Sequence, residues 1–264
     1  MFPAGILGYW LAKKEKLPHI ITEHWSKVDN FFSKSIYSKS GKKAYNTASF
    51  VTVVSEFLRK SVSKHFSNPE KIKVVPNVVN TNVFSYKAKS PSGKLVFCCV
   101  ANWGNPKRPD LIFESLNKFS DTSNKRIVLN VVGEGFLLNE LKTKKWNFDI
   151  NYLGNLSPVG IAEELQRADC FLHASSMETF SIVIAEALVT GTPVLASHVG
   201  AISELVNKEN GLLCNNDVES WVKGIQALTE IKFDNQKISS AAQNYGEEKI
   251  GNKFLELYKL ILSQ

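Results

Sequence analysis

The sequence predicts an α/β protein with two parallel-sheet units. Short β-branched runs alternate with helical patterns along the chain, which is typical of βα units. Most of these runs are apolar throughout, as strands are when helices cover both faces of their sheet. Residues 77–93, rich in Asn, Ser and Lys, lie between two strand patterns and therefore predict a linker between the units.

The expected elements follow one another from residue 6 onward. A helix over 6–14 comes first, and an amphipathic helix over 239–262 comes last. Only about three strands precede the linker, fewer than the five or six of a typical sheet, so the first unit is expected to be incomplete. The nine predicted strands cover residues 19–22, 50–54, 72–75, 95–100, 127–132, 150–153, 170–173, 193–196 and 211–214.

These elements divide the chain into three predicted parts. We expect a partial N-terminal domain over residues 1–84 and a larger ligand-binding domain over 85–245. Residues 246–264 would form a C-terminal helix that packs back towards the N-terminal part.

Composition excludes several classes of protein. With 264 residues, 44% hydrophobic and 22% charged, the chain can bury a large core. No apolar run reaches the roughly 18 residues of a membrane span, and no basic leader opens the chain. Five scattered histidines without H-E-x-x-H, and the lack of a D-x-D pair, predict neither a metal nor another cofactor. Four cysteines within predicted strands, none in C-x-x-C spacing, indicate reduced core residues of a cytoplasmic protein: Cys98, Cys99, Cys170 and Cys214.

The net charge of +7 is unevenly distributed. Residues 1–90 have 15 basic against 5 acidic side chains, whereas residues 91–264 have 17 against 20. Such a basic third can attract anionic lipid headgroups, so we expect peripheral contact with the inner face of a membrane; a solvated lysine-rich surface is the alternative. Aromatic residues do not alternate with arginines, and nucleic acid is therefore not expected as a partner.

The most informative window spans residues 168–211. A strand ends there before a loop that contains Glu178, and a helix is expected from Phe180 to Thr190. Glu178 would thus lie at the carboxyl end of a parallel strand, where open α/β sheets bind ligands. The amide groups of Phe180, Ser181 and Ile182 at the helix start would attract a phosphate.

A second glutamate, Glu186, could direct its carboxylate at the two hydroxyl groups of a ribose. In the alternative interpretation, Glu178 only complements the helix dipole and Glu186 is a solvated helix residue. Gly133 and Gly135 follow a strand, but Leu138 occupies the third glycine position of G-x-G-x-x-G, which argues against a dehydrogenase.

The two glutamates, in E-T-F-S-I-V-I-A-E-A followed by G-T-P-V-L-A-S, resemble the E-x7-E signature of glycosyltransferase family four, whose members are retaining transferases of GT-B fold. Residues 75–84 (V-P-N-V-V-N-T-N-V-F) and 131–135 (V-V-G-E-G) resemble further motifs of that family in the same order. The resemblance implies a C-terminal Rossmann-like domain plus an incomplete N-terminal Rossmann-like domain. It also implies that the chain begins after the first strands of the acceptor domain, near M-F-P-A-G.

The resemblance also implies roles for individual residues. Glu178 and Lys107 become the catalytic pair, because Glu178 matches the glutamate at the donor sugar and Lys107, in residues 100–111, matches a lysine that neutralises the leaving diphosphate. Asn102 stands where the family has an arginine, Arg108 follows Lys107 where the family has glycine, and His24 in T-E-H-W would face the acceptor side. The other donor-binding residues implied are Gly133, Thr179, Phe180, Ser181, Ile182 and, at the ribose, Glu186.

By this resemblance the protein is a retaining glycosyltransferase. It would move a sugar from a nucleotide-diphosphate sugar to a glycan or lipid-linked acceptor in cell-surface polysaccharide synthesis, by front-face displacement. Two alternatives stay open, a non-catalytic nucleotide-sugar binding remnant and a sugar-nucleotide epimerase of GT-B fold.

Overall fold

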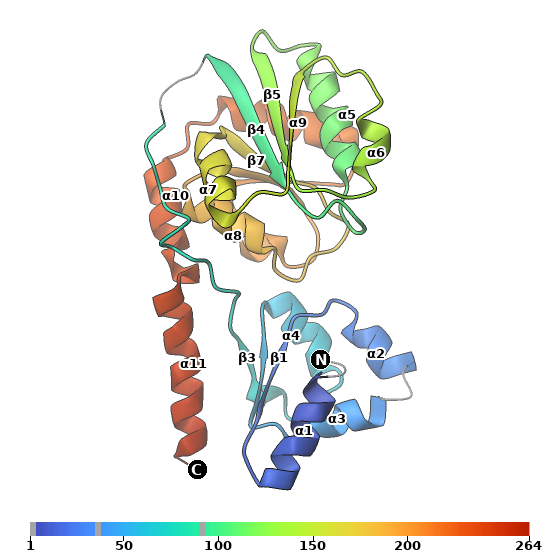
Figure 1. Ribbon diagram of the computed structural model, residues 1–264, viewed down its shortest axis with the longest axis vertical. Coiled ribbons are helices and arrows are strands. Elements are labelled where there is room, and N and C mark those ends of the chain that lie inside the picture. Colours follow the sequence, from blue (N-terminus) through green and yellow to red (C-terminus); the bar gives the residue numbers. More distant parts are fainter. Residues whose placement is uncertain (1–3, 35–37, 90–92, 264) are drawn as a thin grey trace. The chain divides into compact units, whose positions relative to one another are not determined.

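The chain forms two compact units, each built around a parallel sheet (Figure 1). The computed structural model describes residues 4–34, 38–89 and 93–263. Unit 1 comprises Met1–Val78 and Glu248–Gln264, and unit 2 comprises Val79–Glu247. Residues 90–92 of the predicted linker, and residues 1–3 of the opening segment, lie outside the described residues.

Unit 1 has a three-stranded parallel sheet in the order β1-β2-β3. Its strands are β1 (Ile20–Glu23), β2 (Phe50–Val53) and β3 (Ile72–Val74). They confirm the first three predicted strands. The helices that connect or precede them are α1 (Ala4–Glu15), α2 (Val28–Lys34), α3 (Ser38–Thr47), α4 (Glu56–Ser63) and the 3₁₀ turn η1 (Pro69–Lys71).

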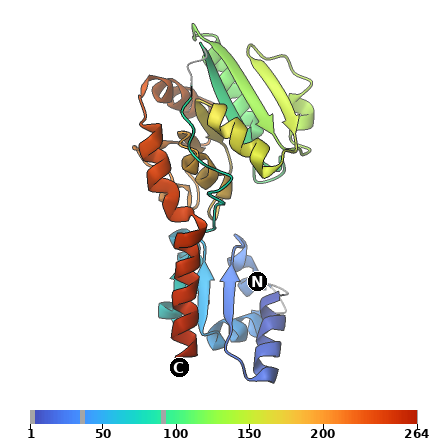
Figure 2. The ribbon, with the colours of Figure 1, turned by 60° about the vertical axis from the view of Figure 1, so that its left-hand side comes forward.

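The long helix α11 (Glu247–Leu262) runs beside this sheet (Figure 2). Its Ile250 and Leu257 are buried against Val75, with Ile20 and Phe50 packed around them. Because these three positions belong to strands or strand ends, the helix at the C-terminus completes the core of the N-terminal unit.

Unit 2 has a six-stranded parallel sheet in the order β6-β5-β4-β7-β8-β9. All six strands occupy positions predicted from the sequence. They are β4 (Lys94–Val100), β5 (Arg126–Val132), β6 (Asp149–Gly154), β7 (Cys170–His173), β8 (Val194–Ser197) and β9 (Gly211–Cys214). The α helices and 3₁₀ turns around them are α5 (Pro109–Ser120), α6 (Leu138–Leu141), α7 (Pro158–Arg167), α8 (Ile182–Val189), η2 (Ile202–Glu204), α9 (Val218–Glu230), α10 (Asn235–Ala242) and η3 (Gln243–Tyr245).

Helices cover both faces of this sheet, which is why its strands are continuously apolar. On one face Phe97 and Leu129 pack against Leu116 of α5 and Trp221 of α9. On the other face α7 contacts β4, and α8 contacts β7 and β8. Successive strand residues point to opposite faces. Cys98, next to Phe97, is also fully buried, because both faces are covered.

Two predicted helices differ from the structure. The C-terminal helix expected over 239–262 is interrupted, because α10 ends at Ala242 and the 3₁₀ turn η3 follows before α11. The helix expected to begin at Phe180 begins at Ile182 instead. Ser181 adopts a left-handed conformation with φ 73°, which is incompatible with a continuing helix.

Candidate donor-binding site

The carboxyl ends of β4 and β7 lie side by side in unit 2, where the strand order reverses. From β4 the chain runs to β5 on one side, whereas β7 and the strands after it extend the sheet on the other side. Loops leaving such a reversal point diverge and form a crevice, the usual ligand site of open α/β sheets. The loops here are residues 101–108 and 174–181, and they carry most of the predicted site residues.

The loop after β4 is held by a glycine turn after β5. The amide of Trp103 donates to the carbonyl of Glu134 at 2.8 Å, and the indole of Trp103, which is buried, donates to Val132 at 2.9 Å. Gly133 has φ +94°, and a Cβ there would lie 1.9 Å from the carbonyl oxygen of Ala101. The motif V-V-G-E-G is therefore a backbone support for the loop that leads to Lys107.

The loops after β4 and β7 are joined to each other by backbone bonds. The amide of Arg108 donates to Ala174 at 3.1 Å, and the amide of Ser176 donates to Pro106 at 2.9 Å. Lys107 and Ser175 form an isolated antiparallel bridge between these bonds. These bonds and the bridge hold the two loops together, although they lie about 70 residues apart in the sequence.

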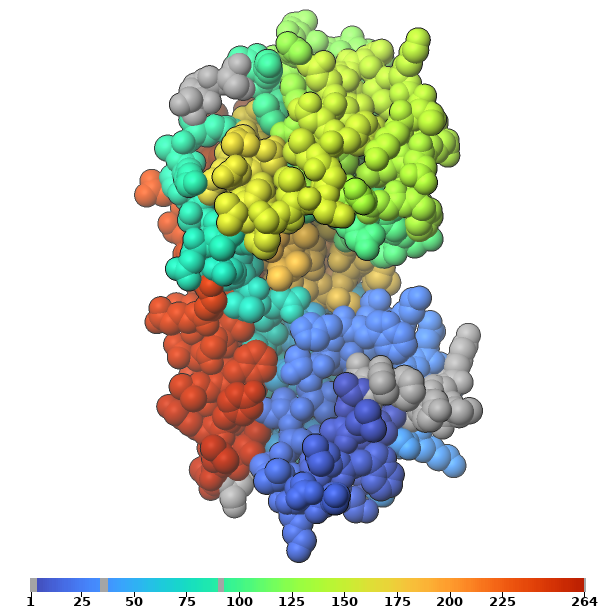
Figure 3. All heavy atoms as spheres, viewed as in Figure 1, coloured from blue at the N-terminus to red at the C-terminus, as the bar shows by residue number. Residues whose placement is uncertain are grey.

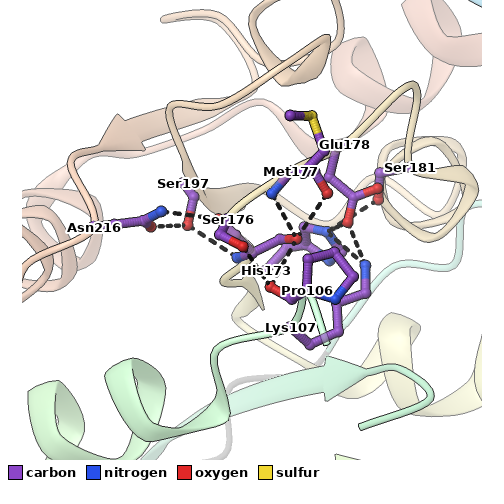
Figure 4. A network of polar contacts seen from close by, with 10 residues as sticks. Pro106, Lys107, His173, Ser176, Met177, Glu178, Ser181, Ser197 and Asn216 are labelled. Atoms are coloured by element: carbon purple, nitrogen blue, oxygen red, sulfur yellow. Dashed lines mark hydrogen bonds and ion pairs between the residues drawn. The ribbon is translucent and has the colours of Figure 1, made fainter. Parts of the chain in front are cut away.

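Lys107, Glu178 and His173 meet at this junction (Figure 4). The Lys107 ammonium forms an ion pair with Oε1 of Glu178, the same oxygen that lies 3.0 Å from Nε2 of His173. Nε2 of His173 also lies 3.4 Å from the Lys107 nitrogen and 3.3 Å from Oγ of Ser181. The predicted catalytic pair is therefore in direct contact, and His173 lies beside both of its members.

Burial and charge set the ionisation of this group. Burial opposes ionisation of Glu178, but the hydrogen bond from His173 and the positive charge of Lys107 outweigh it and lower the pKa of Glu178 to about 2. Burial also lowers the pKa of His173, against the opposing effect of its hydrogen bond to Glu178. At neutral pH Glu178 is therefore a carboxylate, and His173 is a neutral imidazole whose Nε2 donates to it.

The loop after β7 is also supported from β8 and the turn after β9. Oγ of Ser197 accepts from the amide of Ser175 at 3.1 Å and donates to Asn216 at 2.5 Å, while the Asn216 amide group donates back to the Ser175 carbonyl at 3.0 Å (Figure 4). Gly200, with φ +55°, lets the chain approach the Glu178 backbone, since a Cβ there would lie 1.9 Å from the Glu178 carbonyl oxygen.

Helix α8 begins directly after these residues. The amide groups of its first turn, Ile182, Val183 and Ile184, have no carbonyl one helical turn earlier to bond with, so they are available to an anion. This corrects the prediction that Phe180 and Ser181 supply the first helical amides. The left-handed Ser181 instead places its hydroxyl beside His173.

Glu186 lies one turn into α8 and is partly buried. In the described part of the chain no donor contacts its carboxylate. Burial raises the pKa of Glu186 to about 7, because nothing compensates the charge that ionisation would create. The carboxylate of Glu186 can accept hydrogen bonds from two donor groups of a ligand.

The remaining predicted residues are placed differently. Phe180 is buried, with its ring 5.7 Å from that of Tyr245, so only its backbone can reach a ligand. The Arg108 guanidinium forms a bidentate pair with Asp110 at 2.7 to 3.0 Å. Asn102 is exposed in the loop after β4, and Thr179 lies in the loop after β7.

His24 belongs to unit 1, where its amide lies 3.1 Å from a carboxylate oxygen of Glu23.

Sequence reasoning did not find His173 or Gly200. A signal for His173 was present, namely a polar residue ending an apolar strand five positions before Glu178. Nothing local marked Gly200, since the contact it permits is with a residue of another loop.

No group of three or more side chains among the described residues has the arrangement to bind a metal ion. No helix in the same residues combines the length and apolar character that crossing a bilayer requires.

Comparison with known proteins assigns the chain to a family. The family model of glycosyl transferases group 1 matches residues 81–245, which is more than half of the chain. This chain is a group 1 glycosyl transferase family member. A second model, glycosyltransferase family 4, matches residues 1–83, so the resemblance found in the sequence is confirmed.

Two curated glycosyl-transferring proteins are similar to most of the chain. An alpha-monoglucosyldiacylglycerol synthase of Streptococcus pneumoniae is 25% identical over 97% of the chain and 64% of its own length. A galactosyltransferase of Escherichia coli that is named for UDP-Gal and an α-D-GlcNAc-diphosphoundecaprenol is 27% identical over 88% of the chain and 65% of its own length. The chain thus spans about two thirds of the length of these curated relatives.

Solved structures show the same fold. Anabaena HepE in complex with UDP superposes with a TM-score of 0.79 at 18% identity, over 97% of this chain and 76% of HepE. A sucrose-phosphate synthase from Thermosynechococcus elongatus gives a TM-score of 0.76 at 19% identity, over 98% of this chain and 72% of its own. The predicted GT-B fold, with two Rossmann-like parallel-sheet domains, is confirmed.

Proposed function

We propose that this protein is a retaining glycosyltransferase that uses a nucleotide-diphosphate sugar as donor. The observation that carries the proposal is the contact of Lys107 with Glu178 beside the N-terminus of α8. A cation and a helix N-terminus both favour a diphosphate, and the Glu186 carboxylate, which no donor among the described residues contacts, favours the hydroxyl groups of a ribose. Family membership and structural neighbours solved with UDP and UDP-glucose support this assignment.

In the proposed reaction the diphosphate leaves towards Lys107 and the first turn of α8. Negative charge grows on the leaving oxygen in the transition state, so a fixed ammonium and free amides lower the barrier. An ammonium has three N–H donors, and Lys107 can contact a diphosphate while it keeps its bond to Glu178. Glu178, ionised and held by two partners, positions the donor rather than forming a covalent bond, as expected for front-face displacement with retention.

The proposed acceptor is a glycan or lipid-linked molecule used in cell-surface polysaccharide synthesis. The names of the two relatives above, one a diacylglycerol glucoside synthase and the other acting on a diphosphoundecaprenol, support a lipid-linked acceptor. Four buried cysteines without disulfides support a reducing compartment. We propose that the protein acts at the cytoplasmic face of a membrane, with contact through its basic N-terminal third.

Calorimetric titration of UDP, GDP and ADP, and then of their sugar conjugates, tests the donor site. We expect saturable binding of one nucleotide, weakened about 10- to 100-fold in Lys107→Met, because a charge-assisted hydrogen bond contributes roughly 1.5–3 kcal/mol. Lys118→Met, at an exposed lysine of α5, is the matched control and should bind as the wild type does.

The outcome separates the competing functions. Donor binding followed by transfer to an added lipid-linked acceptor, with the anomeric configuration retained in the product, supports the proposal. Binding with no turnover of any kind would favour a nucleotide-sugar binding protein, and conversion of the donor without an acceptor would favour an epimerase. Failure of every nucleotide to bind would refute the donor site itself.

A further inference from the structure

His173 is a buried titratable residue of the donor site that the reaction proposed above does not use. It ends β7, and its side chain is only 3% exposed. All of its polar contacts within the described residues are made by one ring nitrogen, Nε2, which faces Glu178, Lys107 and Ser181 (Figure 4). The other ring nitrogen, Nδ1, has no hydrogen-bond partner among those residues and is therefore open to a proton.

Burial and two charged groups set the charge of His173. Burial is the largest influence and lowers the pKa of His173. Glu178, from the loop after β7, raises this pKa, whereas the charge of Lys107, from the loop after β4, lowers it. The neighbouring strand β8 places the apolar Ala196 beside His173, and Glu186, the titratable residue of α8, is not among the groups that shift its pKa.

A ligand can reach this group of residues. Met177, next to Glu178, and Ile182, the first residue of α8, are each 40% exposed. Atoms of the segment around α8 are visible at the surface of unit 2 in Figure 3. Because Lys107 and the first amide groups of α8 are the proposed partners of the diphosphate, its negative charges would lie beside the cation that Nε2 of His173 contacts.

Binding of a diphosphate would change the balance of charge around His173. A nucleotide sugar brings two negative charges, and they offset the ammonium of Lys107, which contacts both Glu178 and Nε2 of His173. The effect of Lys107 against a charged imidazole is then cancelled, while the carboxylate of Glu178 still favours one. An imidazolium would also give this buried carboxylate a cationic partner while Lys107 binds the diphosphate.

We propose that His173 takes up a proton when the donor diphosphate binds, and that the resulting imidazolium holds Glu178 in place beside the donor sugar. The proton comes from solvent and adds to Nδ1, because Nε2 already carries the hydrogen that it donates to Glu178. His173 is thus a positioning residue that acts on the donor through Glu178. This inference rests on the donor site of the proposed function and adds a proton to its binding equilibrium.

The direction of the pH dependence follows from linkage. The pKa of His173 is higher in the complex than in the free protein, so protonation favours the complex. The contribution of His173 to donor affinity is complete below its pKa in the free protein. It disappears as the pH rises through the higher pKa of the complex, by at most about tenfold in affinity per pH unit.

Calorimetric titration with nucleotide sugars, in buffers of different ionisation enthalpy, counts the protons taken up on binding. The probes are UDP-glucose, GDP-mannose and ADP-glucose, whose phosphates, unlike the terminal phosphate of a free nucleoside diphosphate, do not titrate near neutral pH. We expect the wild type to take up at least about half a proton more than His173→Gln at neutral pH. Glutamine keeps an N–H donor for Glu178 but cannot be protonated in this range. His198→Gln, at an exposed histidine after β8, is the matched control and should behave as the wild type does.

The comparison with His173→Gln also removes the effect of Glu186. Contact with a ribose would favour the ionised form of Glu186, whose pKa is about 7, and would release protons from both proteins alike. The difference in proton uptake between the two proteins therefore belongs to His173. The donor affinity of the wild type should also fall, relative to that of His173→Gln, as the pH rises from about 6 to about 8.

Equal proton uptake by the wild type and His173→Gln, with the nucleotide sugar bound by both, overturns this inference and leaves the donor site intact. If none of the three conjugates binds to the wild type, the donor site fails and this inference fails with it. If His173→Gln does not fold, NMR of the wild type labelled at its five histidines decides the question. The His173 resonance should titrate at higher pH with the donor than without it, and an unchanged or lower midpoint overturns the inference.

Discussion

Replacement of Glu186 by glutamine should make the protein more stable at alkaline pH and impair its nucleotide binding. The pKa of Glu186 is about 7 in the folded protein, raised by burial from an ordinary value of 4.5. Ionisation in the folded state therefore costs up to about 3 kcal/mol, since one pKa unit corresponds to about 1.4 kcal/mol. Glutamine has nearly the same shape and carries no charge.

The sign follows from linkage. Below pH 4.5, the ordinary pKa of the carboxyl group in the unfolded chain, Glu186 is protonated in both the folded and the unfolded state. In that range its raised pKa has no effect on the free energy of unfolding. As pH rises from about 4.5 to about 7, the unfolded wild type ionises at Glu186 while the folded protein keeps the proton, so the wild type loses stability that Glu186→Gln keeps; above pH 7 the difference stays constant. At pH 8 the variant should have a free energy of unfolding larger by up to about 3 kcal/mol, and at pH 4.5 the two proteins should be equal.

Urea unfolding followed by tryptophan fluorescence measures this difference, because Trp103 and Trp221 are buried in unit 2. Glu230→Gln, at an exposed glutamate at the end of α9, is the control and should change stability by no more than about 0.5 kcal/mol at either pH. The reasoning is refuted if Glu186→Gln is no more stable than the wild type at pH 8. If stability increases and nucleotide affinity falls together, Glu186 is a residue whose charge serves binding at the expense of folding.

Three other predictions concern the loop that carries Glu178. Glu178→Gln should destabilise the protein at pH 7 by roughly 3 kcal/mol, because the folded pKa of Glu178, about 2, lies below its ordinary value of 4.5. In urea titrations at successively lower pH, this difference in stability should shrink as Glu178 of the wild type is protonated. A difference that stays constant with pH would contradict the ion-pair explanation. His173→Phe removes a hydrogen bond to Glu178, so acid unfolding should begin at higher pH than in the wild type. His173→Gln keeps an N–H donor and should partly restore the wild-type profile of acid unfolding. Identical unfolding profiles for both variants would show that His173 only fills space. Gly200→Ala should lower both the melting temperature and the nucleotide affinity, because the new Cβ would lie 1.9 Å from the Glu178 carbonyl oxygen. The control Gly251→Ala, at a position of α11 with open space around it, should be neutral or stabilising. A wild-type melting temperature for Gly200→Ala would disprove the close contact.

Much of the fold could be predicted from the sequence because strand patterns are local. The nine strands were found from runs such as residues 95–100 and 127–132, where β-branched and apolar residues follow one another without interruption. Helix ends were less predictable. The start of α8 follows the left-handed Ser181, whose hydroxyl lies beside His173, and the local sequence does not specify this contact.

The sequence by itself determined the family, the parallel α/β architecture and the identity of Lys107, Glu178 and Glu186 as candidate site residues, because residue type and spacing within one segment express these properties. Only the tertiary structure decided which groups meet. It joined Lys107 to Glu178 through loops of two neighbouring strands, placed His173 beside both and paired Arg108 with Asp110. It also brought α11 onto the sheet of unit 1. The physical reason is that packing and charge pairing depend on distances between segments far apart in the chain, which the order of residues does not specify locally.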